Sequence, residues 1–275
     1  MRILFVGDIV GKPGREIVHR AVVPLVRAYD LDLVIANVEN AAGGFGVTRE
    51  TAEAILAAGV AVMTSGNHVW DKKEALEYVA TETRLLRPLN YPTAAPGRGS
   101  VVVTTLRGHR IAVVNAMGRV HMPLVDDPFG ALLVETARLR QAATVVIVDF
   151  HAEATSEKVA MGWHLDGKVT AVVGTHTHVQ TADERVLPGG TAYISDVGMS
   201  GPHDSVIGVE RDAALARFLT GLPSRFETAT GNPRLNAVII EADPDTGRAM
   251  SISRLNLGVD DVAALQRDAS LGAGT

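Results

Sequence analysis

The stretch Val169–His178 reads VTAVVGTHTH, and it joins a short apolar run directly to two histidines. Val169–Val173 is rich in β-branched residues and has the length of a buried strand. A glycine and a threonine follow, and then come His176 and His178, two residues apart. Side chains at this spacing share one face of an extended segment, and in a turn they can diverge toward two neighbouring ligands. The stretch therefore predicts a buried strand that ends in a polar site.

Similar apolar runs and amphipathic segments alternate along the rest of the chain. The other predicted strands are Ile3–Val6, Leu33–Ala36, Ala61–Thr64, Ile111–Asn115 and Thr144–Val148. The predicted helices are Arg15–Arg27 with Pro13 ahead of it, Arg49–Ala58 capped by Thr48, Lys72–Val79 capped by Asp71, and Gly130–Gln141. Strands that alternate with helices are typical of α/β folds.

Two further segments read as hairpins. Val101–Leu106 is joined to Ile111–Asn115 by a short polar turn, and Ala237–Glu241 is joined to Met250–Leu255 by a turn that contains Asp-Pro-Asp-Thr-Gly. Hairpins added to alternating strands and helices predict mixed sheets. We therefore expect a single α/β domain over residues 1–268, with a two-sheet core flanked by helices, and a loose Gly/Ala-rich tail over 269–275.

Composition limits the classes of protein to which the chain can belong. Its 275 residues are 47% hydrophobic, carry a net charge of −5 and include no cysteine. These values fit a packed globular protein without disulfides or thiolate metal sites. No long basic run is present, so a large nucleic-acid surface is not expected. No run approaches the roughly 18 apolar residues of a membrane span, and the apolar start is too short for a signal peptide. We expect a soluble, cytoplasmic protein.

Metal-competent side chains follow four of the other predicted strands. They are Asp8, Glu39 with Asn40, Asn67, and His151. Carboxyl ends of parallel strands meet where open α/β sheets place their sites, so we expect these side chains to join His176 and His178 at one sheet edge. Carboxylate, amide and imidazole groups suit iron, manganese, zinc or cobalt. Each residue alone could be structural, as a cap, a solvated loop or a core histidine, and only their joint placement favours a metal site.

These blocks resemble the calcineurin-like metallophosphoesterase superfamily. Gly66–His68 (GNH) is intact, His151 fits the lone histidine of the pattern, and Gly174–His178 matches Gly-His-x-His with one residue inserted. Two blocks depart from the pattern, because Asp8 is not followed by the histidine of Asp-x-His and Glu39 with Asn40 replaces Gly-Asp. The departures are similar to the bacterial YmdB-like branch, whose signatures are Gly7–Gly11 (GDIVG), Asn37–Gly44 (NVENAAGG), Gly66–Asp71 (GNHVWD) and Gly174–Asp183 (GTHTHVQTAD).

The resemblance implies a fold in which two mixed β-sheets pack as a sandwich between helices, with two divalent or trivalent transition-metal ions at one end. Iron ranks first, manganese second, and zinc or cobalt behind them. The residues that would hold the ions are assigned as follows: Asp8 and His178 to one ion, Asn67, His151 and His176 to the other, and Glu39 bridging both. Asn40 would replace the missing histidine, with a substrate contact or a brace for Glu39 as open alternatives.

The activity that the resemblance implies is hydrolysis of 2′,3′-cyclic nucleotides or similar small phosphodiesters. A hydroxide held between the ions would attack phosphorus in line, and His68 would protonate the leaving oxygen. A phosphomonoesterase with the same site and a non-catalytic metal-binding regulatory protein are the alternatives. The expected partner is a small phosphodiester, and a homo-oligomer is expected from the resemblance alone.

Overall fold

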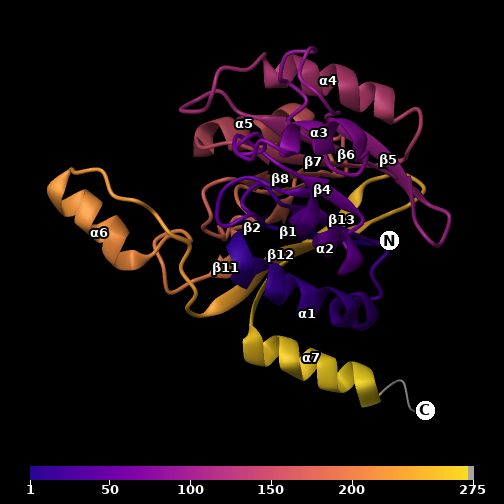
Figure 1. Cartoon of the computed structure of the whole chain (residues 1–275). Coiled ribbons are helices and arrows are strands. Elements are labelled where there is room, and N and C mark those ends of the chain that lie inside the picture. The colour runs from indigo at the N-terminus through magenta and orange to yellow at the C-terminus, as the bar shows by residue number, and fades with distance from the viewer. Residues whose placement is uncertain (272–275) are drawn as a thin grey trace.

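The computed structural model describes residues 1–271 of the chain, and its side chains through residue 267. Figure 1 shows two stacked sheets with helices on their outer faces. The strands are β1 (Arg2–Val6), β2 (Asp8–Ile9), β3 (Leu33–Asn37), β4 (Val62–Thr64), β5 (Ser100–Thr104), β6 (Arg110–Met117), β7 (Val145–His151), β8 (Ala171–Thr175), β9 (Arg185–Val186), β10 (Ala192–Ile194), β11 (Met199–Pro202), β12 (Pro233–Ala242) and β13 (Ala249–Gly258). The helices are α1 (Gly11–Tyr29), α2 (Arg49–Ala57), α3 (Ala75–Thr81), α4 (Pro128–Leu139), α5 (Thr155–Leu165), α6 (Arg211–Thr220) and α7 (Val259–Leu271).

Both sheets are mixed, as the sequence predicts. The first has the order β2-β11-β12-β1-β3-β4, and β13 also pairs with β12; the second has the order β5-β6-β7-β8-β10-β9. In the first sheet β1, β3 and β4 run parallel to one another, and β12 is antiparallel to β1. In the second, β6, β7, β8 and β10 are parallel. Both predicted hairpins are present, as β5 with β6 and β12 with β13.

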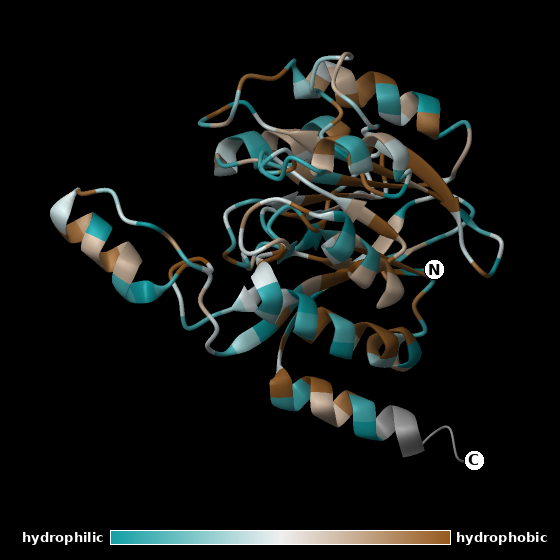
Figure 2. Cartoon of the chain, viewed as in Figure 1, coloured by the Kyte–Doolittle hydropathy of each residue, from teal (hydrophilic) through white to brown (hydrophobic). Residues whose placement is uncertain are grey.

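Alternating side chains of the strands divide the core into three layers. On β1, Ile3 and Phe5 point into the core between the two sheets, whereas Leu4 and Val6 point into the core beneath α1 and α2. A third core lies between the second sheet and helices α4 and α5. In Figure 2 α1, α4 and α7 carry both apolar and polar residues, as expected for helices that bury one face. The layers are therefore helix, sheet, sheet, helix, with one core shared between the two sheets.

The helices differ from the predicted ones at several ends. Thr48 caps α2 as predicted, with its side chain accepting from the backbone of Thr51. The prediction that Asp71 caps a helix over Lys72–Val79 is wrong, because α3 begins only at Ala75. The Asp71 carboxylate instead accepts a hydrogen bond from an imidazole described below. Helix α7 runs to Leu271, and the remainder of the predicted tail, 272–275, lies outside the described residues.

A segment over residues 203–232, here called the arm, leaves the sandwich between β11 and β12. It carries α6, which stands clear of the two sheets in Figure 1. Within α6 only Ala214 is buried, while Leu215, Phe218 and Leu219 are exposed.

Among the described helices, none combines the length and the hydrophobicity that crossing a membrane requires.

Candidate metal centre

All seven predicted ligand residues lie where the carboxyl ends of strands from both sheets meet. Asp8 follows β1, Glu39 and Asn40 follow β3, and Asn67 follows β4; His151 ends β7, and His176 and His178 follow β8. The prediction that a single sheet edge carries them is wrong, because β1, β3 and β4 belong to one sheet and β7 and β8 to the other. The two sheets stack, so side chains from both converge on one end of the sandwich.

The Nε2 atom of His151 is the centre of one group of potential ligand atoms. It lies 3.1 Å from Glu39 Oε1, 3.1 Å from Asn67 Oδ1 and 3.0 Å from His176 Nδ1. Glu39, His151 and His176 each offer a ligand atom within 4.8 Å of the other two. These atoms carry lone pairs that a cation could share, and they come from both sheets.

Asn40 and His178 form a second group beside the first, and Asp8 lies against the backbone of His176. Asn40 Nδ2 lies 3.1 Å from His178 Nε2 and 3.2 Å from Glu39 Oε1, and Asp8 Oδ2 accepts a 3.2 Å hydrogen bond from the His176 amide. Within the described part of the chain, Asp8 Oδ1 and Asn40 Oδ1 are buried without a hydrogen-bond partner. Leaving such oxygens unpaired is costly. A cation would satisfy them, so the residues present fit a metal site.

The orientation of His151 is fixed from below by two buried side chains. The Thr175 hydroxyl donates a 2.7 Å hydrogen bond to Asp149 Oδ1, and Thr175 Oγ1 lies 2.9 Å from His151 Nδ1. Because a hydroxyl has only one proton to donate, the Nδ1–H of His151 is the donor to Thr175. This tautomer leaves Nε2 available at the centre of the site. Partners of this kind usually orient metal-ligating histidines.

The other two histidines are held in the same manner. His176 Nε2 lies 3.1 Å from Glu153 Oε2, so its Nδ1 is the nitrogen that faces His151. His178 Nδ1 donates to the Ile207 carbonyl at 2.8 Å, which leaves its Nε2 toward Asn40. His176, His178 and Ile207 all have positive φ, at 102°, 67° and 47°. Strained backbone of this kind concentrates at functional sites.

Electrostatics set the charge of the cluster. Burial would raise the pKa of Glu39, but the neighbouring charge of His151 and hydrogen bonds hold it at about 2. Burial would lower the pKa of His151, whereas the charge of Glu39 raises it to about 9. Burial and the charge of His151 lower the pKa of His176 to about 3. Glu39 is thus anionic and His176 neutral near pH 7, which are the forms that bind metals, whereas His151 would have to release a proton when a cation binds.

Position 66, just after β4, must be glycine because the side chains of the site approach its backbone closely. A β-carbon at this position would collide with the His151 ring and with Glu39 Oε2. The glycine of the Gly-Asn-His block therefore makes room for the centre of the cluster, and the following Asn67 supplies an oxygen to it.

The cluster opens into a cavity of about 330 Å³. Glu39, Asn40, His68, Glu153, His176 and His178 line its polar end, and Val10, Phe45, Ile207, Val209 and Phe226 line much of the remainder. His68 Nδ1 lies 2.8 Å from Asp71 Oδ2, so the predicted acid has a carboxylate partner. No lysine or arginine is found in this lining within residues 1–271. The charge of a bound phosphate would therefore have to be met by cations.

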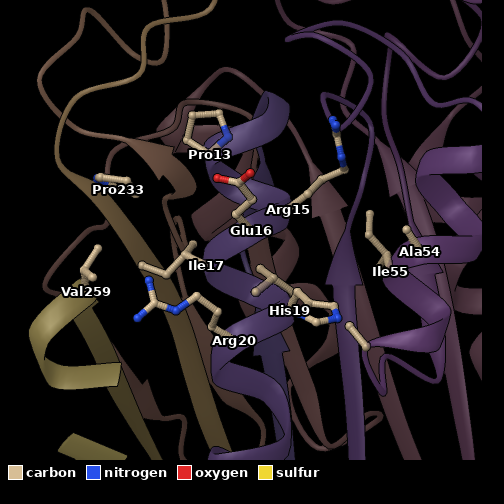
Figure 3. A pocket seen from close by; sticks show the side chains of 12 residues that line it. Pro13, Arg15, Glu16, Ile17, His19, Arg20, Ala54, Ile55, Pro233 and Val259 are labelled. Atoms are coloured by element: carbon tan, nitrogen blue, oxygen red, sulfur yellow. The ribbon is translucent and has the colours of Figure 1, made fainter. Parts of the chain in front are cut away.

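Figure 3 shows a second cavity, of about 360 Å³, which lies over α1 between α2 and the start of α7. Its lining includes His19 and Glu16 from α1, together with apolar residues such as Ile17 and Ile55. Among the described residues, the Glu39, His151 and His176 group is the one whose His and carboxylate atoms lie close enough to hold an ion. The chemistry is therefore assigned to the first cavity.

The two-sheet sandwich, with a carboxylate and imidazole cluster at its end, defines a hydrolase of the calcineurin-like metallophosphoesterase class. Within that class the chain belongs to the YmdB-like family, whose model matches residues 4–255. The chain is 46% identical over 263 residues to the 2′,3′-cyclic-nucleotide 2′-phosphodiesterase of Bacillus subtilis (strain 168), across 94% of this chain and 98% of that protein. The resemblance inferred from the sequence is confirmed.

Solved structures agree with the fold. A crystal structure of a hypothetical protein from Thermus thermophilus superposes with a TM-score of 0.88 at 43% identity, covering 94% of this chain and 99% of that one. A crystal structure described as a novel phosphatase from Mycoplasma pneumoniae superposes with a TM-score of 0.87 at 37% identity, covering 94% and 93%. The predicted αββα sandwich is confirmed.

Sequence reasoning missed several residues that hold the cluster in place. They are Asp71 beside His68, Glu153 beside His176, Ile207 beside His178, and Thr175 with Asp149 beneath His151. Glu153 lies two residues after His151, and Asp71 lies three after His68. This short spacing in the sequence could have indicated that the two carboxylates lie near the site. Ile207 belongs to the arm and is 29 residues from His178, so no local pattern could find it.

We expect Glu153→Leu to lower the affinity for transition metals about 10–100-fold, the usual effect of losing such a partner. The substitution removes the acceptor that holds His176 Nε2–H and therefore frees the ring to turn. Glu153→Gln keeps an acceptor oxygen and should recover part of the affinity. The measurement is competition for the metal against a chelator of known affinity. Glu50→Leu, an exposed substitution on α2, is the control, and wild-type affinity in Glu153→Leu would contradict the role.

Proposed function

We propose that this chain hydrolyses small phosphodiesters, with 2′,3′-cyclic nucleotides as the first substrates to test, at a site that holds two transition-metal ions. The observation that carries the proposal is the convergence of Glu39, Asn67, His151 and His176 beside the unpaired buried oxygens of Asp8 and Asn40. The name of the Bacillus subtilis relative supports the same class of substrate.

The proposed ligands divide into two halves that Glu39 joins. Asp8 and His178 would hold one ion, and Asn67, His151 and His176 the other. The contacts of the Glu39 Oε1 atom support the bridging role, because it lies 3.1 Å from His151 Nε2 and 3.2 Å from Asn40 Nδ2. Asn40 would complete the half that contains His178 through its unpaired Oδ1, while its Nδ2 donates to Glu39 Oε1 at 3.2 Å and braces that carboxylate. Iron is proposed first and manganese second.

Two bound ions would lower the pKa of a water molecule toward about 7 and offset the negative charge that grows on the phosphate oxygens. The side chains of the chain supply the rest of the chemistry. His68 lines the cavity, and its Nδ1 faces the Asp71 carboxylate. Asp71 would orient the imidazole, and the opposite nitrogen, Nε2, would give its proton to the departing sugar oxygen. A cytoplasmic location is also proposed, on the support of a chain without cysteine.

The lining of the cavity favours diesters over the rival class, phosphomonoesters. Outside the proposed metal ligands it contains the carboxylates of Glu153 and Glu227, and within the described residues it has no lysine or arginine to offset them. A monoester at neutral pH is close to a dianion, whereas a diester carries a single negative charge. The carboxylates of the cavity lining therefore repel a diester less strongly than a monoester.

Protein loaded with iron or manganese should bind about two ions per chain by elemental analysis and release nucleoside monophosphate from 2′,3′-cyclic nucleotides. It should also hydrolyse bis(p-nitrophenyl) phosphate in clear preference to p-nitrophenyl phosphate. Chelation should remove both activities. Failure on every cyclic and aryl diester with two ions bound would refute the proposal. Rapid turnover of the monoester alone would establish the rival instead.

A further inference from the structure

The base of the arm is fixed to the polar end of the cavity. Val209 bridges to both Val206 and Thr228, and the Ala229 amide donates to the Gly208 carbonyl at 2.9 Å. The neighbouring Ile207 carbonyl holds His178. Although α6 stands clear of the sandwich, the two chain segments that lead to it are thus part of the wall of the site.

The glycine-rich loop after β3 packs directly against this base. Gly44 has φ of +95°, and a β-carbon there would lie 2.6 Å from Thr228 Oγ1. Only glycine allows this approach. The contact places Phe45, from the loop, and Phe226, from the arm, in the lining of one cavity.

The two aromatic rings are positioned by polar neighbours and remain open to the cavity. The guanidinium of Arg217 lies 5.1 Å from the centroid of the Phe226 ring, so it covers one face of that ring. Phe45 is 39% exposed and meets the His68 ring edge-on, with centroids 5.0 Å apart. Such rings expose apolar surface to water beside the polar end of the cavity, and a flat apolar group would cover that surface.

We propose that Phe226, with Phe45, forms a stacking subsite for the nucleobase of the substrate. This inference rests on the proposed function and extends it, because it places the base on the arm side of the cavity and the phosphate at the metal centre. A cavity of about 330 Å³ has the size of a small-ligand pocket. Every base presents a π-face, so stacking tolerates all four bases. The enzyme should therefore accept 2′,3′-cyclic nucleotides with little preference among bases.

The test compares two substrates that share the five-membered cyclic phosphate. One is 2′,3′-cyclic AMP, and the other is glycerol 1,2-cyclic phosphate, which lacks a base. In metal-loaded protein, Phe226→Ala should raise KM for the nucleotide about five- to 100-fold and leave KM for the glycerol ester unchanged. Phe226→Tyr keeps a stacking ring and should stay close to wild type, whereas Phe226→Leu, which is apolar without a π-face, should behave like alanine. Phe218→Ala, at an exposed position on α6, is the matched control.

Binding is measured in parallel, by calorimetric titration of the same proteins with adenosine 2′-monophosphate and adenosine 3′-monophosphate. A nucleotide-specific loss in Phe226→Ala supports the subsite. An equal change for both substrates would mean that Phe226 only maintains the cavity, and no change for either would mean that the base lies elsewhere; both outcomes overturn the inference. If the wild type hydrolyses neither substrate, the proposed function fails. The calorimetric comparison then still decides whether the nucleotide stacks on Phe226.

Discussion

Replacing Glu39 with glutamine is expected to lower kcat at least about 10²–10³-fold, because the proposed bridge between the two ions would lose its charge and one of its oxygens. The carboxylate is fully buried, with Oε1 at 3.1 Å from His151 Nε2 and Oε2 accepting from the His68 amide at 3.1 Å. Glutamine keeps the size of the side chain, so the sandwich should fold. Its amide nitrogen cannot bind a cation. One of the two contacts of the side chain, with His151 Nε2 or with the His68 amide, would therefore become repulsive.

The measurement is elemental analysis together with turnover of a 2′,3′-cyclic nucleotide. Glu39→Gln should hold fewer than two ions per chain, and the circular dichroism spectrum should match that of the wild type. Glu50→Gln, at an exposed position of α2, changes the same functional group far from the cluster and should keep both the ions and the rate. Two bound ions with a normal rate in Glu39→Gln would remove Glu39 from the centre of the mechanism.

The strands were predictable because their apolar runs are buried on both faces. Ile3–Val6 alternates between two different cores, so every residue of the run is apolar and the strand is visible without knowing its partners. His151 was found for a related reason, since it ends such a run on β7. The assignment of strands to two sheets was less accessible, because pairing depends on residues far apart in the chain, as in the pairing of Leu4 with Ile239.

The arm could not be predicted because its helix buries almost nothing. Only Ala214 of α6 is buried, so the helix lacks the apolar stripe that reveals helices packed on a core.

Asp71 was misread for a different reason. A carboxylate just ahead of an amphipathic run is typical of a helix cap, and the same spacing from His68 also allows an ion pair. In the structure the carboxylate pairs with the imidazole, and the helix begins three residues past the predicted start.

His68→Ala is expected to lower kcat for 2′,3′-cyclic nucleotides about 10²–10⁴-fold, the usual contribution of a general acid. The sugar oxygen is a poor leaving group and needs a proton as it departs. The p-nitrophenolate ion is stable without one, so bis(p-nitrophenyl) phosphate should lose much less rate in the same variant. The backbone amide of residue 68, which donates to Glu39 Oε2, is retained in alanine, so both ions should stay bound.

The leaving-group comparison separates an acid from a residue that only shapes the cavity. If His68 merely supported Phe45, whose ring it meets edge-on, the variant would raise KM for the nucleotide and leave kcat close to wild type, whereas loss of the acid lowers kcat. Asp71→Asn provides a graded version, because it weakens the partner of His68 Nδ1 without removing the imidazole, and it should cost less than His68→Ala on the nucleotide and almost nothing on the aryl ester. Full nucleotide turnover in His68→Ala with two ions bound would exclude the acid role. Since a non-catalytic metal-binding protein predicts no loss of function in this variant, the large nucleotide-specific loss expected here also distinguishes the enzyme from that alternative.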